Sequence, residues 1–409
     1  MFSAEGGRPG PLHGLRVLDF TRVVAGPYAT LLLGDLGADV LKVESPQRGD
    51  DSRAWGPPFL ADDSAYYLGM NRNKRSIALD LKNPEGVAIA RDLAARSDVV
   101  IENFRPGVME RLGLDYESLR EGHPELVYCS ISAFGDRGPY REWAGYDVMI
   151  SAMGGLMGIT GMPGGEPVKV GVAVVDVATG LYAALGVTCA VVEAQRTGQG
   201  QRVSTSLLSV ELAILVNAAS SYLLAGEVMP PQGAAHQSIV PYQTFRCADD
   251  WIVIAAPNDR MFAILAAQLG TPQWPGDPRF STNRARVANR EVLCALIGGI
   301  VAQHPAAEWL DRLGAAGIAV APVNRMDQVF TDPRVLALDP VIEVEHPRHG
   351  PLRMVRPALE FGATPASPAA HPPGLGEQTD ELLREVLGLG AAELARLRTA
   401  GGIGTQDRL

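Results

Sequence analysis

Short apolar runs alternate with helical patterns over the first 135 residues, and few folds accommodate that alternation. The runs at 15–20, 39–43 and 98–101 have the length and composition of buried strands, and residues 28–36 between the first two have a helical pattern. Strand–helix–strand units of this kind build a parallel sheet with helices on both faces. The sequence therefore predicts an α/β fold with a doubly wound sheet.

Two stretches rich in glycine, proline and alanine, at 226–242 and 366–374, divide the 409 residues. A chain of this length exceeds the size of a single core, so two domains are expected. Between the stretches, strands and helices alternate from 244 to about 322, which predicts a smaller α/β domain. We expect a large domain at 1–202, a linker helix and loop at 203–243, the small domain at 244–335, and a return to the large domain at 336–409.

The composition limits the partners of the protein. The net charge of −10, without a basic run, argues against nucleic acid as the main partner. The four cysteines are widely spaced and form no C-x-x-C pair, so neither a zinc site nor a disulfide framework is indicated. Apolar stretches near 177–194 and 206–224 contain glutamates, and the N-terminus lacks the apolar region of a signal peptide. We interpret both stretches as buried core helices of a cytoplasmic protein with no membrane partner.

Asp176 lies within an apolar run, GVAVVDVA, directly before a helix predicted over 177–195. Two interpretations stay open. Aspartate is a preferred N-cap residue, so Asp176 is expected to cap this helix. A poorly hydrated carboxylate, kept ionised by helix N–H groups, can also act as a covalent nucleophile.

Four other segments have residues suited to a ligand. The turn at 24–27 opens a helix whose N–H groups can bind phosphate, although the G-x-G-x-x-G fingerprint of nicotinamide enzymes is absent. Residues 102–107 follow the carboxyl end of a strand, where α/β sheets bind ligands. The segment 67–76 is predicted to be a cationic loop, either solvated or part of an anion site, and the glycine run 154–161 is predicted to be a flexible loop or a connector.

Several motifs carry a family resemblance. The segments LDFTRVVAGPYATLLLGDLGADVLKVE, NRNKRSIALDLK, DVVIENFRPGVMERLGLD and RTGQGQRVSTSL, together with Asp176, resemble the class III CoA-transferases, or CaiB/BaiF family, over essentially the whole chain. GDDSRAWGPPF, AGYDVMISAMGGLMGITG and AAHQSIVPYQTF are similar to the succinyl-CoA:glutarate CoA-transferase branch, which works on dicarboxylates. The resemblance implies a Rossmann-like large domain made from both chain ends, a small domain from the middle, and an interlocked homodimer.

The resemblance also implies roles for individual residues. Asp176 would attack the donor acyl-CoA, form an aspartyl anhydride and then carry CoA as a thioester. CoA thioesters would be substrates, with no permanently bound cofactor and no metal. Ser45 stands where some relatives place an arginine, so that cation is not available to the CoA nucleotide. Residues implied to contact CoA are Val24, Ala25, Leu79, Lys82, Asn103, Phe104, Arg105, Arg111 and Tyr146.

A dicarboxylate acceptor needs a cation or several donors for its distal carboxylate. Arg53, Arg72 and His236 are the candidates. Glutarate, malate, citramalate, mesaconate and itaconate all stay open, because a one-carbon difference changes binding by only about 1–3 kcal/mol.

Three alternatives belong to other classes of function. An α-methylacyl-CoA racemase needs an acid–base pair, and those relatives place histidine before the aspartate of the AG-x-D motif. Tyr146 occupies that position, and a tyrosine with a pKa of about 10 is a poor base near neutrality. A non-catalytic CoA-binding protein would not need Asp176 in its apolar surroundings. A nicotinamide dehydrogenase would need the absent glycine fingerprint.

Overall fold

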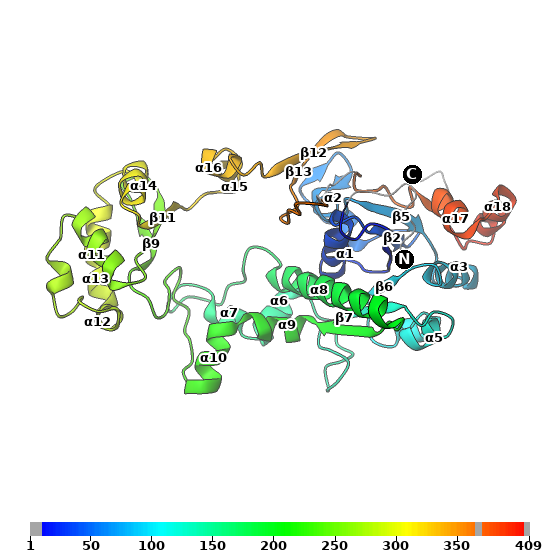
Figure 1. Ribbon diagram of the computed structural model, residues 1–409, viewed down its shortest axis with the longest axis horizontal. Coiled ribbons are helices and arrows are strands. Elements are labelled where there is room, and N and C mark those ends of the chain that lie inside the picture. Colours follow the sequence, from blue (N-terminus) through cyan, green and yellow to red (C-terminus); the bar gives the residue numbers. More distant parts are fainter. Residues whose placement is uncertain (1–9, 365–369, 405–409) are drawn as a thin grey trace. The chain divides into compact units, whose positions relative to one another are not determined.

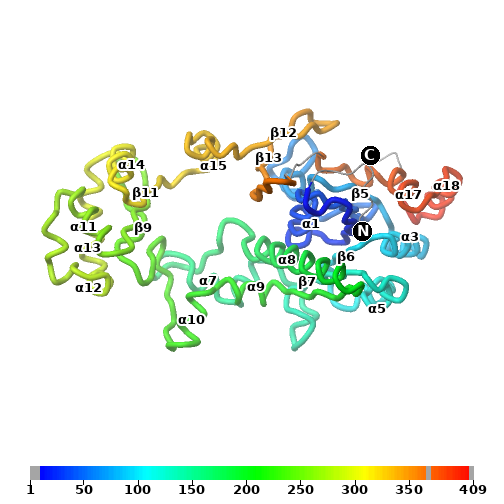
Figure 2. The backbone as a smooth tube through the Cα atoms, viewed as in Figure 1, coloured from blue at the N-terminus to red at the C-terminus, as the bar shows by residue number. Residues whose placement is uncertain are grey.

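The computed structural model describes residues 10–364 and 370–404, and they divide into two compact units. Within the described residues, the first unit comprises the chain up to Leu156, Lys169–Ala219, and the chain from Val341 onward. The second unit comprises Met157–Val168 and Ser220–Pro340. The first unit therefore takes residues from both the blue beginning and the red end of the chain (Figure 2).

Six parallel strands form the sheet of the first unit, in the spatial order β5-β2-β1-β6-β7-β8 (Figure 1). Counted along the chain, these six strands follow the order 3-2-1-4-5-6 of a doubly wound fold, and the order reverses between β1 and β6. The predicted α/β fold with a parallel, doubly wound sheet is confirmed. The strands are β1 (Arg16–Asp19), β2 (Asp39–Glu44), β5 (Lys74–Ala78), β6 (Val99–Glu102), β7 (Val127–Ser132) and β8 (Arg202–Ser206).

Both faces of this sheet are covered, because successive side chains of a strand point to opposite faces. On β1, Leu18 packs in one core with side chains of α3, α17 and α18, whereas Val17 packs in another core with those of α1 and α8. This double coverage explains the continuous apolar runs of the central strands β1 and β6. The helices named are α1 (Ala25–Asp35), α3 (Pro84–Ala94), α8 (Val174–Thr197), α17 (Thr379–Leu387) and α18 (Ala391–Thr399).

Helices α1 and α8 pack closely because Gly180 has no side chain. A Cβ atom at Gly180 would lie 2.7 Å from the carbonyl oxygen of Ala25. The buried face of α8 includes Val175, Ala183 and Val187. By length and hydropathy alone, α8 is the one helix within residues 10–364 and 370–404 that could cross a membrane, and the bent pair α9 and α10 qualifies if taken together.

The region after α8 differs from the prediction. The segment predicted to begin a linker at 203 is β8, which pairs with β7 as the edge strand of the sheet. The long core helix predicted to reach 224 is instead two helices, α9 (Leu207–Ile214) and α10 (Val216–Ala225), bent by 77°. No side chain of α10 is buried within the described chain, so the prediction of a core helix is wrong there.

Two predicted loops also contain regular structure. The glycine run at 154–161 contains α7 (Leu156–Ile159), and the segment 67–76 contains the end of α2 (Ala65–Met70) and the start of β5. The remaining elements of the first unit are η1 (Asp51–Ala54), β3 (Phe59–Leu60), β4 (Asp63–Ser64), α4 (Val108–Leu112), α5 (Tyr116–Arg120), α6 (Asp147–Met153), β12 (Val341–His346) and β13 (Gly350–Val355).

The second unit has a core of its own around an antiparallel sheet in the order β11-β10-β9. Helices supply the other side of this core, including the buried Phe262, Leu293 and Trp309. The strands are β9 (Tyr242–Arg246), β10 (Trp251–Ala255) and β11 (Ala319–Pro322), and the helices are α11 (Asp259–Gln268), η2 (Trp274–Gly276), α12 (Asn283–Ala288), α13 (Arg290–Val301), α14 (Ala306–Ala315), α15 (Met326–Val329) and α16 (Pro333–Leu336).

Candidate active site

A cavity of about 270 Å³, here called the Asp176 cavity, lies beside the carboxyl ends of β1 and β6. The strand order reverses between these two strands, and α/β sheets bind ligands at such a point. Asp51, the end of β7 and Leu207 form part of its wall, and the rest comes from the β1–α1 turn, the segment after β6, the loop before α6, and the start of α8. The residues of these four segments are Arg22–Ala25, Asn103–Pro106, Trp143–Tyr146 and Asp176.

A larger cavity of about 930 Å³ adjoins the first, since Phe104, Arg105 and Arg141 line both. Arg111 and Arg202 add further cations to its wall. Its wall also contains Glu102, which accepts a hydrogen bond from the Ser130 hydroxyl, and burial raises the pKa of Glu102 to about 7. Together the two cavities offer a site with Asp176 at one end and, along the other part, four arginines among several acidic side chains.

Asp176 is the third residue of α8 and not its N-cap, which is Ala173. The helix start is capped by Asp147, whose Oδ1 accepts the N–H groups of Val175 at 2.8 Å and of Asp176 at 3.2 Å. The interpretation of Asp176 as the cap is therefore wrong. Within the described residues, no hydrogen bond reaches the Asp176 carboxylate, which leaves it open to react.

The surroundings of Asp176 disfavour its negative charge. Burial first, and then the charge of Asp147, raise the pKa of Asp176 to about 7. The expectation that helix N–H groups keep Asp176 ionised is wrong, because Asp147 has taken up two of those groups. A carboxylate with a pKa near neutrality is a stronger nucleophile than an ordinary aspartate, and about half of it is ionised at pH 7.

The start of α1 faces the Asp176 cavity through Val24, its N-cap residue, and Ala25. Both side chains are buried. In the part of the chain that the structure describes, no residue accepts a hydrogen bond from the N–H groups of Val24, Ala25 or Gly26. These N–H groups and the positive end of the helix dipole are therefore free to bind an oxygen with partial negative charge.

Two residues predicted to contact CoA fix the same turn. The Asn103 side chain accepts the N–H of Arg22 at 2.9 Å and donates to the Arg22 carbonyl oxygen at 2.8 Å. The Arg22 guanidinium lies over the Phe104 ring, 4.8 Å from its centre. Asn103 thus ties the end of β6 to the β1–α1 turn, in addition to lining the cavity.

Only some of the other residues predicted to contact CoA line one of the two cavities. Arg105 lines both cavities, Arg111 the larger one, and the exposed Tyr146 the Asp176 cavity. Leu79, whose side chain is buried in the core, and the exposed Lys82 line neither cavity. Their contact with the nucleotide stays a prediction. Separately, the Ser45 hydroxyl donates to the Gln47 side chain at 2.7 Å.

The geometry argues against Arg53 and Arg72 as acceptor-binding cations. Arg53 donates to both carboxylate oxygens of Glu44, each at 2.7 Å. Arg72 donates in the same way to Asp35, at 2.9 and 2.5 Å. Each guanidinium is thus already paired, and breaking a buried pair of this kind is costly.

His236 belongs to the second unit. Its ring stacks on Tyr242, and its Nδ1 accepts the N–H of Ser238. Its role in acceptor recognition stays a prediction.

Tyr66 and Trp55 were not identified from the sequence. Burial first, then the charges of Asp176 and Asp147, raise the pKa of the Tyr66 phenol, so this hydroxyl lies within the field of both carboxylates. The Trp55 ring meets the Tyr66 ring edge-on at 5.4 Å. The signal in the sequence was the aromatic residues of WGPPF and YYLGM, which the loop interpretation left without a role.

Comparison with known proteins gives one consistent result. Residues 12–379 match the model of the family described as CoA-transferase family III. The chain is 42% identical to the succinyl-CoA:glutarate CoA-transferase of Homo sapiens, over 96% of this chain and 89% of the human protein. It is 41% identical to the succinate–glutarate CoA-transferase of Agrobacterium fabrum, over 93% of this chain and 96% of that protein. Among solved structures, a CAIB/BAIF family protein from Brucella suis superposes with a TM-score of 0.84 at 41% identity, covering 93% of this chain and 100% of that one.

Proposed function

This chain belongs to CoA-transferase family III, and from that premise we propose that it moves CoA from succinyl-CoA to glutarate with Asp176 as the nucleophile. The main observation behind the proposal is the environment of the Asp176 carboxylate. It lies in a cavity at the reversal point of the sheet, its pKa is raised to about 7, and no described residue hydrogen-bonds to it. The choice of substrates rests on the names of the human and bacterial relatives.

The reaction proceeds by four displacements at carbonyl carbon. A carboxylate oxygen of Asp176 attacks the succinyl carbonyl carbon, the C–S bond breaks, and CoA thiolate leaves a succinyl–aspartyl anhydride. The thiolate attacks the aspartyl carbonyl carbon, which releases succinate and leaves CoA as a thioester on Asp176. Glutarate attacks this thioester and expels the thiolate, which then attacks the glutaryl carbonyl carbon. Glutaryl-CoA leaves, the carboxylate is restored, and no proton or electron is gained or lost overall.

Each displacement places negative charge on a carbonyl oxygen. We propose that the free N–H groups of Val24 and Ala25, at the start of α1, stabilise that oxygen, as fixed donors do in acyl-transfer enzymes. Asp176 is only partly exposed in the single chain, and bound CoA would have to exclude the remaining water, because water would hydrolyse both the anhydride and the thioester. The Tyr66 hydroxyl is suited to donate to a carboxylate near Asp176.

The two adjoining cavities suit the two ends of CoA. We propose that the thioester end occupies the Asp176 cavity beside Tyr146, and that the phosphates meet Arg105 and Arg111 in the larger cavity. Asn103 and Phe104 would hold the wall between them. Leu79 and Lys82 would contact the nucleotide beyond these cavities. CoA thioesters are substrates in this proposal, and the chemistry described requires no bound cofactor.

A panel of carboxylate acceptors with succinyl-CoA as donor tests the proposed substrates. Glutarate is expected to give the highest kcat/KM, and shorter or hydroxylated dicarboxylates values lower by about 10- to 100-fold, since a methylene is worth about 1–3 kcal/mol. Formation of the new acyl-CoA is followed by liquid chromatography. A preference for a monocarboxylate would refute the dicarboxylate assignment. Exchange of an α-proton of a branched acyl-CoA without any transfer would indicate racemase chemistry instead.

The outer face of α8 supports the proposal of an interlocked homodimer. Leu181, Leu185 and Val192 recur on that face at helical spacing and are at least half exposed in the single chain. An exposed apolar stripe of this length is typical of a surface covered by another protein chain. Sedimentation equilibrium is expected to give twice the mass of the chain, and Leu185→Glu together with Val192→Glu is expected to shift the protein toward monomer. A monomer in the unmodified protein would contradict the dimer.

A further inference from the structure

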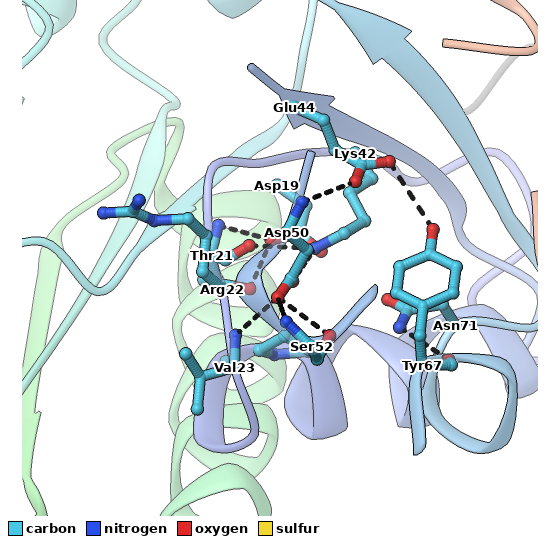
Figure 3. Close-up of polar contacts among 12 residues, drawn as sticks. Asp19, Thr21, Arg22, Val23, Lys42, Glu44, Asp50, Ser52, Tyr67 and Asn71 are labelled. Carbon is cyan, nitrogen blue, oxygen red and sulfur yellow. Dashed lines mark hydrogen bonds and ion pairs between the residues drawn. The ribbon is translucent and has the colours of Figure 1, made fainter. Parts of the chain in front are cut away.

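A pair of fully buried charges lies behind the β1–α1 turn (Figure 3). Lys42 on β2 and Asp50 just before η1 are both 0% exposed, and Lys42 Nζ donates to Asp50 Oδ2 at 2.9 Å. Burial alone would lower the pKa of Lys42, but Asp50, Asp19 and Glu44 raise it. Lys42 and hydrogen bonds from Ser52 likewise outweigh burial and lower the pKa of Asp50 to about 2. The Lys42–Asp50 pair therefore stays charged over the whole working pH range.

The remaining bonds of this pair go to the backbone of the turn. Lys42 Nζ donates to the carbonyl oxygen of Thr21 at 2.9 Å, and Asp50 Oδ1 accepts the N–H of Val23 at 3.1 Å. Arg22, between these two residues, is held by the Asn103 side chain. Side chains from elsewhere in the first unit thus fix the backbone of three successive residues. Figure 3 shows the bonds to Thr21 and Val23 meeting at the buried pair.

Val23 needs these hydrogen bonds to keep its conformation, because its φ angle is +74°. A β-branched residue is strained in this region, where glycine is the usual residue. Strained residues persist only where their surroundings fix them, and they gather at functional sites. The next two residues, Val24 and Ala25, line the Asp176 cavity and carry the free N–H groups at the start of α1.

We propose that Lys42 and Asp50 are positioning residues: they hold Val23 in its strained conformation, which keeps the turn in the shape that binds the thiol end of CoA and points the N–H groups of Val24 and Ala25 at the reacting thioester. This inference rests on the proposed function, because it assigns the turn to CoA. Neither side chain lines the Asp176 cavity. Their effect on CoA would pass through the backbone of the turn and through Asp51, the residue after Asp50, which lines the cavity.

A buried ion pair can also be purely structural, and the same helix offers a matched control. Asp35, the last residue of α1, pairs with Arg72, and the two side chains are 4% and 7% exposed. Asp35→Asn breaks a buried pair at the far end of α1, whereas Asp50→Asn breaks one beside the turn. Both variants are expected to lower Tm, but a positioning role predicts different effects on CoA.

CoA binding is measured by titration calorimetry on the full-length protein, and KM is measured separately for succinyl-CoA and glutarate. Asp50→Asn is expected to raise Kd for CoA and KM for succinyl-CoA at least about tenfold, with KM for glutarate unchanged within about twofold. Asp35→Asn is expected to leave Kd for CoA within about twofold of the wild type. An equal loss of CoA affinity in the two variants would overturn the positioning role.

The role of the strained residue is tested by a double-mutant cycle with Val23→Gly. Glycine adopts a positive φ without strain. The hydrogen bond from the N–H at position 23 to Asp50 should therefore matter less in the Val23→Gly protein. Asp50→Asn is expected to weaken CoA binding less than about threefold when Val23 is glycine. An equal fold-increase in Kd for CoA on Asp50→Asn, with valine and with glycine at position 23, would overturn the inference. If Asp50→Asn does not fold, Lys42→Gln takes its place in the cycle with the same expectations.

The proposed function and the positioning role can be refuted separately. A wild-type protein that does not bind CoA would refute the proposed function, together with the assignment of the turn to CoA. A wild-type protein that binds CoA with a Kd unaffected by Asp50→Asn would refute only the positioning role.

Discussion

Replacing Asp176 by alanine is expected to lower the rate of CoA transfer from succinyl-CoA to glutarate by at least about 10³-fold, because the variant has no group to carry the acyl chain or CoA. The fold should persist, since Asp147 and not Asp176 caps α8. Binding of CoA should persist as well, because the turn and the cations of the adjoining cavity are unchanged. Steady-state assays and titration calorimetry measure the two quantities separately.

The matched control for Asp176→Ala is Glu193→Ala on the same helix. Glu193 is partly exposed and pairs only with Arg196 among the described residues, so transfer should stay within about twofold of the wild type. A covalent path is tested by adding succinyl-CoA and hydroxylamine, which should convert Asp176 to a hydroxamate visible by peptide mass spectrometry. Transfer by Asp176→Ala at the wild-type rate, or an unmodified Asp176 peptide after this treatment, would contradict the mechanism.

The sheet could be predicted from the sequence because its signal is local. The central strands β1 and β6 are covered on both faces, so their apolar runs are continuous and lie between helical patterns. The break between α9 and α10 could not be predicted in this way. Both helices are apolar enough to pass together as one segment, and no glycine or proline marks the 77° bend between them.

The candidate site was predicted in part. Asp176 and the β1–α1 turn stand out locally, as a carboxylate and a helix start among apolar residues. The partners of charged groups do not stand out. Arg53 and Arg72 looked available for an acceptor because nothing near them in sequence shows that Glu44 and Asp35 hold them. Asp147, which caps α8 from 28 residues away and raises the pKa of Asp176, was missed for the same reason.

Replacing Asp176 by asparagine is expected to stabilise the protein above pH 7, even though it removes the nucleophile. The pKa of Asp176 is about 7 in the folded protein, against an ordinary value of 3.8. Between these two values the folded state binds a proton that the unfolded state releases, so the contribution of Asp176 to stability falls as pH rises through this window. Above pH 7 both states are ionised and the full cost of the buried charge is present.

Asparagine has nearly the same shape and no charge, so it avoids this cost. The gain at pH 8 is expected to be on the order of 1–3 kcal/mol, below the limit set by the pKa difference because Asp176 is partly exposed to solvent. Urea unfolding of both proteins at pH 5 and pH 8, at equal protein concentration, gives the difference in free energy of unfolding. That difference should be smaller at pH 5, because much of the buried carboxyl is then protonated and uncharged in the wild type.

Asp147→Asn, which keeps an acceptor for the N–H groups of α8 but removes the second charge, should give a smaller gain at pH 8. An equal difference at the two pH values would show that the surroundings of Asp176 do not disfavour its charge, and the account of its reactivity would fail with it.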